Sequence, residues 1–292
     1  MITSGFTPGR SPPPRIGRYE LTGELGFGGM GRVFSAIDPK TSRRVALKVV
    51  RDDLGNETMI RHATLRLLRE AWVLAKVRHP NVVRFIEVSD QPGAIFLATE
   101  LVEGMDLDAW CLEPRDWRQV VDILVGTGRG LAAVHGYGLV HGDFKPSNIL
   151  VGEDGLGRLA DFGLAVPAGI MGEPTGMVIG TPKYMAPERR RGAAPSVLAD
   201  QFSFCATLFE TLGAFRELPF KDRGPPQRFW DIVRRGRAER PEDRYLSMHE
   251  ILDFIDHAVK DAPTRALPPQ AKTDHEDTGP TRPLRAATPT EG

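Results

Sequence analysis

The chain has 292 residues, 41% of them hydrophobic, and its 38 lysines and arginines balance its 38 aspartates and glutamates. This length allows one large domain or two smaller ones with a substantial core, and zero net charge gives no indication of a nucleic-acid binder. Two cysteines, Cys111 and Cys205, exclude a disulfide framework, and the apolar neighbours of Cys205 predict a buried, unreactive thiol. The sequence contains neither a run of about eighteen apolar residues nor an apolar signal segment. We therefore expect a cytoplasmic protein with neither a membrane nor a nucleic-acid partner.

Both ends of the chain have compositions that disfavour a packed core. Residues 1–17 are rich in proline and glycine, and residues 261–292 are rich in proline, threonine and charge. We predict that both segments are disordered. The C-terminal segment offers candidate phosphorylation sites, although an unmodified linker explains it equally well. These threonines are Thr273, Thr278, Thr281, Thr288 and Thr290.

Between these ends the hydrophobic pattern changes once. Residues 18–50 alternate apolar and polar positions with glycine punctuation, which predicts strands, as do the apolar runs at 82–88 and 95–100. Residues 60–77 are expected to form a helix with an apolar stripe at Leu65, Leu68, Trp72 and Leu74. Beyond Gly104 the pattern is mainly helical. The expected helices lie near residues 116–135, 196–213, 226–236 and 246–259.

A glycine-rich segment lies between the first two strand-like runs. Its G-x-G-x-x-G spacing is shared with dinucleotide-binding folds, but those require a helix next, whereas residues 32–36 continue as a strand. Glycines in such a loop let the backbone approach phosphate oxygens closely. The residues of this segment expected to contact a ligand are Leu25, Gly26, Phe27, Gly28, Gly29, Met30, Gly31 and Val33.

A second group of polar residues runs from His141 to Asn148 and continues at Asp161-Phe162-Gly163. The apolar run at 149–151 and the turn-like residues after it predict a short strand pair, which would bring the two polar segments together. Oxygens of Asn148 and Asp161 would suit a hard divalent cation. Asp143 could then accept a proton from a hydroxyl nucleophile, and Lys145 could offset charge on a transferring phosphoryl group. The alternative is that these residues are ordinary turn formers.

These segments, with Val45-Ala46-Leu47-Lys48 and Ala186-Pro187-Glu188, resemble the motifs of eukaryotic-type protein kinases. The lysine two residues after Asp143 resembles the serine/threonine branch, and the match is closest to bacterial members. The resemblance covers about residues 18–260. It implies an α+β, two-lobed kinase fold, with a small antiparallel-sheet N-terminal lobe (about 18–101) carrying one main helix. A larger, mainly helical C-terminal lobe (about 105–260) would follow.

The resemblance also implies cofactors, partners and residue roles. ATP with Mg²⁺ or Mn²⁺ would be the cofactors, and proteins with serine or threonine hydroxyls, including the chain itself, would be substrates in bacterial signalling. The catalytic residues would be Asp143, Lys145, Asn148, Lys48 and its ion-pair partner Glu70, with metal held by Asn148 and Asp161. Further ATP-binding positions would be Ala46, Thr99, Glu100, Val102, Asp106 and Leu150.

Other matching positions are expected to organise the site. Thr181 would hydrogen-bond Asp143 and Lys145, and Thr175 stands where bacterial relatives carry a phosphorylation site. Glu188 would pair with Arg244, and Asp200 would hold the backbone of the catalytic loop.

Two departures from the family pattern bear on function. Gly142 replaces an arginine that meets the activation-segment phosphate, so we expect only weak dependence on that phosphate. The stretch between 220 and 244 is short, so a helix that commonly docks substrates is expected to be missing or shrunken. These departures keep open an alternative, a nucleotide-binding pseudokinase scaffold. A small-molecule kinase is disfavoured, because Gly180-Thr181 and Ala186-Pro187-Glu188 shape a groove for a peptide.

Overall fold

A computed structural model describes residues 14–28, 31–50, 57–91, 94–169, 180–213 and 224–262. Gly29, Met30 and Thr175 lie outside the described residues, as do most of the predicted N-terminal segment and nearly all of the C-terminal one.

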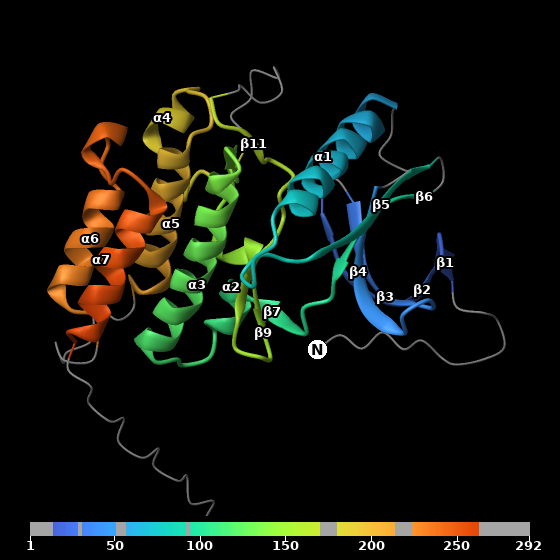
Figure 1. Ribbon diagram of the computed structural model, residues 1–292, viewed down its shortest axis with the longest axis horizontal. Coiled ribbons are helices and arrows are strands. Elements are labelled where there is room, and N and C mark those ends of the chain that lie inside the picture. Colours follow the sequence, from blue (N-terminus) through green and yellow to red (C-terminus); the bar gives the residue numbers. More distant parts are fainter. Residues whose placement is uncertain are drawn as a thin grey trace, which may run out of the picture. The chain divides into compact units, whose positions relative to one another are not determined.

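The N-terminal lobe is built on one antiparallel sheet with strand order β1-β2-β3-β4-β6-β5 (Figure 1). Its alternating sequence gives the sheet two different faces. Val45 and Leu47 of β4 are buried in a small core with Tyr19 and Phe96, whereas Ala46 and Lys48 point to the opposite face. The strands are β1 (Arg15–Ile16), β2 (Tyr19–Gly28), β3 (Gly31–Asp38), β4 (Arg43–Val50), β5 (Phe85–Gln91) and β6 (Ala94–Glu100).

The long helix α1 (Glu57–Lys76) crosses this lobe and packs against the sheet. The predicted helix is confirmed, but its predicted apolar stripe is wrong. Leu74 is buried, while Leu65 is 47% exposed and Trp72 is 49% exposed. The buried face instead combines three larger apolar residues with two alanines and a glutamate. Its members are Ala63, Leu67, Glu70, Ala71, Val73 and Leu74.

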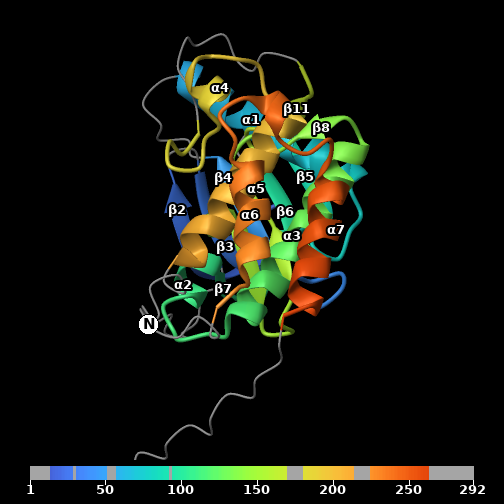
Figure 2. The ribbon, with the colours of Figure 1, turned by 90° about the vertical axis from the view of Figure 1, so that its left-hand side faces the viewer.

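The C-terminal lobe is mainly helical (Figure 2), and three of its longer helices begin at side-chain caps. Asp116 and Gln119 form a capping box at the start of α3, and Ser196 and Ser247 cap α5 and α7. The three capped helices begin within two residues of their predicted starts, and α6 does so without a side-chain cap. The helices are α2 (Leu107–Trp110), α3 (Trp117–Gly136), α4 (Pro187–Arg190), α5 (Val197–Thr211), α6 (Gln227–Gly236) and α7 (Met248–Lys260).

Short strands at the junction of the lobes carry the polar segments. The predicted strand pair is confirmed as β9 (Ile149–Gly152) and β10 (Gly157–Leu159), joined by β7 (Gly104–Asp106). A 3₁₀ turn at Pro146–Asn148 leads into β9, and β8 (Leu139–Val140) pairs with β11 (Val166–Pro167). Residues 139–167 therefore fold back on themselves and bring both polar segments to one side of the C-terminal lobe.

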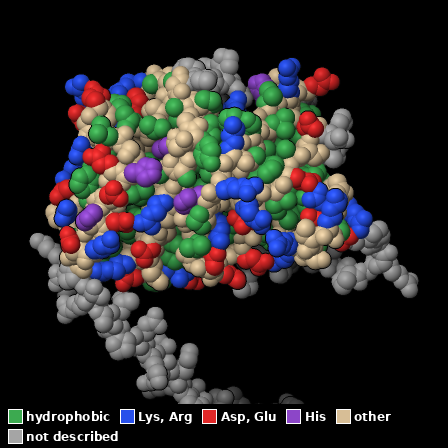
Figure 3. Space-filling view, viewed as in Figure 1, with side chains coloured by type: hydrophobic (Ala, Val, Ile, Leu, Met, Phe, Trp, Pro, Cys, Tyr) green, Lys and Arg blue, Asp and Glu red, His purple; other side chains and the backbone are tan. Residues whose placement is uncertain are grey.

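The expected two-lobed α+β architecture is confirmed by this arrangement. The short stretch before Arg244 contains α6, and residues 214–223 lie outside the described part, so the missing docking helix remains a prediction. Acidic and basic side chains are interspersed on the face drawn in Figure 3. Within the described residues, none of the helices combines the length and apolarity that crossing a membrane requires.

Candidate active site

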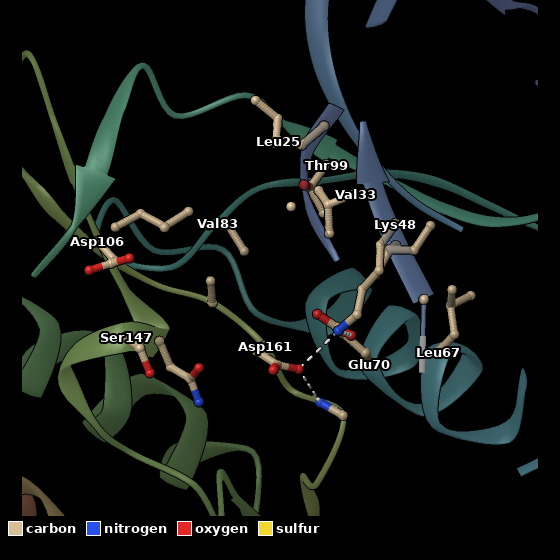
Figure 4. Close-up of a pocket in the computed structure, with 18 of the residues that line it drawn as sticks. Leu25, Val33, Lys48, Leu67, Glu70, Val83, Thr99, Asp106, Ser147 and Asp161 are labelled. Atoms are coloured by element: carbon tan, nitrogen blue, oxygen red, sulfur yellow. Dashed lines mark hydrogen bonds and ion pairs between the residues drawn. The ribbon is translucent and has the colours of Figure 1, made fainter. Parts of the chain in front are cut away.

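A cavity of about 910 Å³ opens between the two lobes, large enough for a nucleotide-sized ligand. Mainly apolar side chains line one end: Leu25 and Val33 lie on the sheet side beside Thr99, with Val83 nearby (Figure 4). Charged side chains line the other end. All predicted ligand-contacting residues with described side chains belong to the lining. These are Leu25, Gly26, Gly31, Val33, Ala46, Lys48, Thr99, Glu100, Val102, Asp106 and Leu150.

Three charged side chains, here called the interlobe cluster, meet in this cavity: Lys48 of β4, Glu70 of α1 and Asp161 (Figure 4). Lys48 Nζ lies 2.7 Å from Glu70 Oε2 and 2.9 Å from Asp161 Oδ1, which confirms the predicted Lys48–Glu70 ion pair. Burial alone would lower the pKa of Lys48, but the two carboxylates raise it above its ordinary value. The ammonium therefore stays protonated and joins three separate elements.

Asp161 adopts an unusual backbone conformation. Its φ is +57°, in the left-handed region that few residues other than glycine and asparagine adopt. Its Oδ1 accepts a hydrogen bond from Gly163 N (3.4 Å) as well as from Lys48. Burial would raise the pKa of Asp161, but Lys48 holds it below 3.8, so the side chain is an anion. Backbone strain of this kind concentrates at functional sites.

A second group, the catalytic-loop cluster, consists of Asp143, Lys145, Asn148 and Thr181. Lys145 Nζ lies 2.7 Å from Asp143 Oδ2 and donates to Thr181 Oγ1 at 2.8 Å. The backbone N–H of Thr181 donates to Asp143 Oδ1 (3.1 Å), so both predicted contacts of Thr181 are present. The carboxylate of Asp143 is thereby held in one orientation at the edge of the cavity.

Asn148 and Asp161 form an oxygen donor set suited to a hard cation. Asn148 donates its side-chain N–H to the Asp143 carbonyl (2.8 Å), which leaves its amide oxygen as the acceptor end. Among the described residues no group of three or more His, Cys, Asp or Glu side chains could hold a metal. Two protein oxygens suffice for Mg²⁺, which usually completes its shell with water and substrate phosphates.

The catalytic loop rests on a buried carboxylate from α5. Asp200 is 1% exposed and accepts the backbone N–H groups of His141 (2.8 Å) and Gly142 (2.9 Å), as predicted. His135 Nε2 lies 2.9 Å from Oδ2, the carboxylate oxygen that also accepts from His141. Burial would raise the pKa of Asp200, but these hydrogen bonds lower it below 3.8. The loop is also fixed by Phe144, which is fully buried against Phe204 of α5.

A buried ion pair holds the end of the activation segment. Arg244 is 2% exposed and contacts both carboxylate oxygens of Glu188 at 2.7 and 2.8 Å. Further donations to the carbonyls of Leu198 and Ala238 satisfy the guanidinium. This pairing was predicted, and its bidentate geometry is the strong form of a carboxylate–arginine contact.

Gly142, where the family carries arginine, has a conformational reason to be glycine. Its φ is +81°, and a Cβ would lie 3.2 Å from the Leu164 carbonyl oxygen. A side chain here would be strained, so a simple return to arginine conflicts with the observed backbone.

Glu100, at the junction of the lobes, makes two contacts that were not predicted from the sequence. Glu100 receives the backbone N–H of Arg84 on Oε1 (2.9 Å), and Arg158 of β10 lies 3.7 Å from the same oxygen. The N–H of Glu100 itself donates to the Arg84 carbonyl, and its carbonyl accepts from Thr99 Oγ1 at 3.3 Å. Asp106 lines the cavity and also caps α2 by accepting from Ala109 N. No local pattern marks Arg158 for this contact.

The described residues form a two-lobed protein with a nucleotide-sized cleft. A lysine–glutamate pair lies on one wall of the cleft, and a loop that carries a carboxylate lies on the other. The protein kinase domain family matches residues 19–275. The chain belongs to this family, and the resemblance stated from its motifs is confirmed.

Its relatives include bacterial proteins that are named serine/threonine-protein kinases. Serine/threonine-protein kinase pkn2 of Myxococcus xanthus is 34% identical, covering 78% of this chain and 28% of that protein. Serine/threonine-protein kinase PknH of Mycobacterium tuberculosis is 30% identical, covering 94% of this chain and 47% of that protein. Serine/threonine-protein kinase AfsK of Streptomyces griseus is 35% identical, covering 77% and 27%. The chain thus spans less than half the length of these relatives.

Proposed function

We propose that this chain is an active serine/threonine protein kinase that transfers the γ-phosphoryl group of ATP to protein hydroxyls, including its own. The observation that carries the proposal is the presence of both clusters on one cavity: Lys48 bonded to Glu70 and Asp161, and Asp143 oriented by Lys145 and Thr181. A scaffold that only binds nucleotide has no need of the second cluster.

In this proposal the apolar end of the cavity receives the adenine, and Lys48 contacts the α- and β-phosphates. Asp143 orients the acceptor hydroxyl and takes its proton, while Lys145 offsets charge on the transferring group. Asn148 and Asp161 would hold Mg²⁺, which would supply positive charge against the negative charge that develops on the phosphates. The rate enhancement comes from positioning and electrostatics, without a covalent enzyme intermediate.

The test is transfer of radiolabelled phosphate from ATP to the chain itself and to a generic basic protein, with Mg²⁺ or Mn²⁺. Asp143→Asn should abolish transfer, while Asp253→Asn, an exposed aspartate of α7, should leave it unchanged. Transfer that survives in Asp143→Asn would overturn the assigned role. Nucleotide binding without transfer in the unaltered chain would support the scaffold alternative.

The weak dependence on activation-segment phosphate is tested separately. Because Gly142 offers no guanidinium to a phosphate on Thr175, Thr175→Ala should retain most of the transfer activity. An inactive Thr175→Ala variant that is folded by circular dichroism would refute this part of the proposal.

A further inference from the structure

An ion pair between Lys183 and Glu210 lies beside the catalytic-loop cluster. Lys183 follows Thr181 by two residues, and Glu210 is in the last turn of α5. Lys183 Nζ is 2.9 Å from Glu210 Oε2 and also 5.6 Å from the centroid of the Tyr184 ring. Two contacts therefore hold a lysine whose side chain is 56% exposed.

Lys183 is close along the chain to a residue of the catalytic-loop cluster. Thr181 is bonded to both Asp143 and Lys145, and two residues of chain span at most about 7 Å. The carboxylate of Asp108 on α2 gives an independent indication. Burial, and then Asp106, raise its pKa, whereas Lys183 and Lys145 lower it. Lys183 and Lys145 therefore both act on the carboxylate of Asp108, which places the two ammonium groups in one neighbourhood.

A peptide whose hydroxyl reaches Asp143 must run past Thr181, which is hydrogen-bonded to Asp143, and its residues next to the hydroxyl then lie near Lys183. Unpaired, Glu210 would be a carboxylate on that path, only 34% exposed and able to attract a basic substrate side chain. With Lys183 present the pair is neutral. A basic side chain would have to displace an intramolecular partner, which competes at a high effective concentration.

We infer that Lys183 is a specificity-determining residue: it occupies Glu210 and makes the protein indifferent to a basic residue next to the acceptor hydroxyl. The inference rests on the proposed kinase function. It adds that a basic residue next to the acceptor hydroxyl does not affect the choice of substrate. A specificity change then requires only the removal of the competing lysine.

The experiment measures kcat/KM for serine peptides that carry arginine or alanine at each of the three positions on either side of the serine. In the unaltered chain the arginine-to-alanine ratio should stay near one. Lys183→Ala should raise the ratio at one position by about two- to fivefold, the range of an exposed ion pair. Lys183→Glu should raise it further, and the swapped pair Lys183→Glu with Glu210→Lys should bring it back toward one.

Arg191→Ala is the matched control. Arg191 forms an exposed ion pair with Glu239 at 2.8 Å, and neither residue lines the cavity. Its removal should leave every ratio unchanged.

The outcomes separate this inference from the kinase proposal. Normal transfer with unchanged ratios in Lys183→Ala and Lys183→Glu would overturn the inference alone. A uniform fall of kcat/KM for all peptides would assign Lys183 a structural role instead, and an arginine preference in the unaltered chain would also contradict it. Failure of the unaltered chain to phosphorylate itself or any peptide would overturn both proposals.

Discussion

The two clusters of the site are held in different ways. The catalytic-loop cluster lies within the C-terminal lobe, where Asp200 binds the loop's backbone N–H groups and Phe144 packs into the core. The interlobe cluster joins β4, α1 and the loop at Asp161 through the single ammonium of Lys48.

The catalytic-loop cluster therefore depends only on the folding of the C-terminal lobe. The interlobe cluster depends on how the two lobes are arranged. Backbone hydrogen bonds to a buried carboxylate survive as long as the C-terminal lobe is folded. A salt bridge between separate elements is kept only while α1 stays close to β4 and Asp161. Displacement of α1 would therefore dissolve the interlobe cluster and leave the catalytic-loop cluster intact.

The largest expected effect follows from Asp161, which both joins the lobes and belongs to the oxygen donor set. Asp161→Asn should reduce phosphoryl transfer about 10³-fold, because the charge facing Lys48 and a cation is lost. Asparagine tolerates a left-handed backbone, so the melting temperature should change little. Transfer assays with thermal denaturation test this, and activity within tenfold of the unaltered chain would contradict it.

Asp200→Asn breaks the support of the catalytic-loop cluster. An amide cannot accept from two backbone N–H groups and His135 as the carboxylate does, so the free energy of unfolding should fall by about 2–4 kcal/mol. Urea denaturation measures the loss, with Asp253→Asn as the exposed control. An unchanged midpoint would show that the loop does not depend on Asp200.

Asp200 should also make the stability of the protein depend on pH. The folded-state pKa of Asp200 lies below its ordinary 3.8, so the unfolded state binds the proton more tightly. The stabilisation is therefore fully present above about pH 4 and is lost as the pH falls through the folded-state pKa. Asp200→Asn should flatten this part of the acid-unfolding curve. A curve as steep as that of the unaltered chain would assign acid sensitivity to other carboxylates.

Glu70→Gln tests the other cluster and should separate activity from stability. Glutamine keeps a hydrogen bond to Lys48 but not the charge, so kcat/KM should fall about 10- to 100-fold through loss of positioning. Because Lys48 keeps Asp161, the free energy of unfolding should change by less than about 1 kcal/mol. A loss of stability as large as that of Asp200→Asn would show that both clusters stabilise the fold, which contradicts the prediction.

The smallest effect is expected on the outer face of α1. Trp72 is 49% exposed and contacts Lys76 through its ring at 4.3 Å, so Trp72→Ala should cost less than about 1 kcal/mol. Leu67→Ala, on the buried face of the same helix, should cost about 2–4 kcal/mol and serves as the comparison. Denaturant unfolding of both variants is the measurement, and equal losses would show that the outer face is covered.

Much of the site could be predicted because its parts are contiguous in sequence. The Val45–Lys48 strand, the loop from His141 to Asn148 and Asp161-Phe162-Gly163 each carry their chemistry in a few adjacent residues whose types are required by that chemistry. A helix over residues 60–77 was predicted from its pattern and is present at Glu57–Lys76, but the face that it buries was not predicted. Apolar residues occur around much of this helix, and only the position of the sheet decides that Leu67 rather than Leu65 faces inward.

Periodicity and short motifs are local properties, so the sequence alone was enough to predict the strand-rich N-terminal part, the helical C-terminal part and the charged residues of the cleft. The two-lobed architecture followed from the resemblance of these motifs to those of protein kinases. Only the tertiary structure decided which groups meet. The contact of Lys183 with Glu210, the support of Glu100 by Arg158 and the positive φ of Gly142 all join or constrain residues whose neighbours are distant in sequence. Such contacts depend on how α5, β10 and the catalytic loop pack together, and no local pattern of residues encodes that packing.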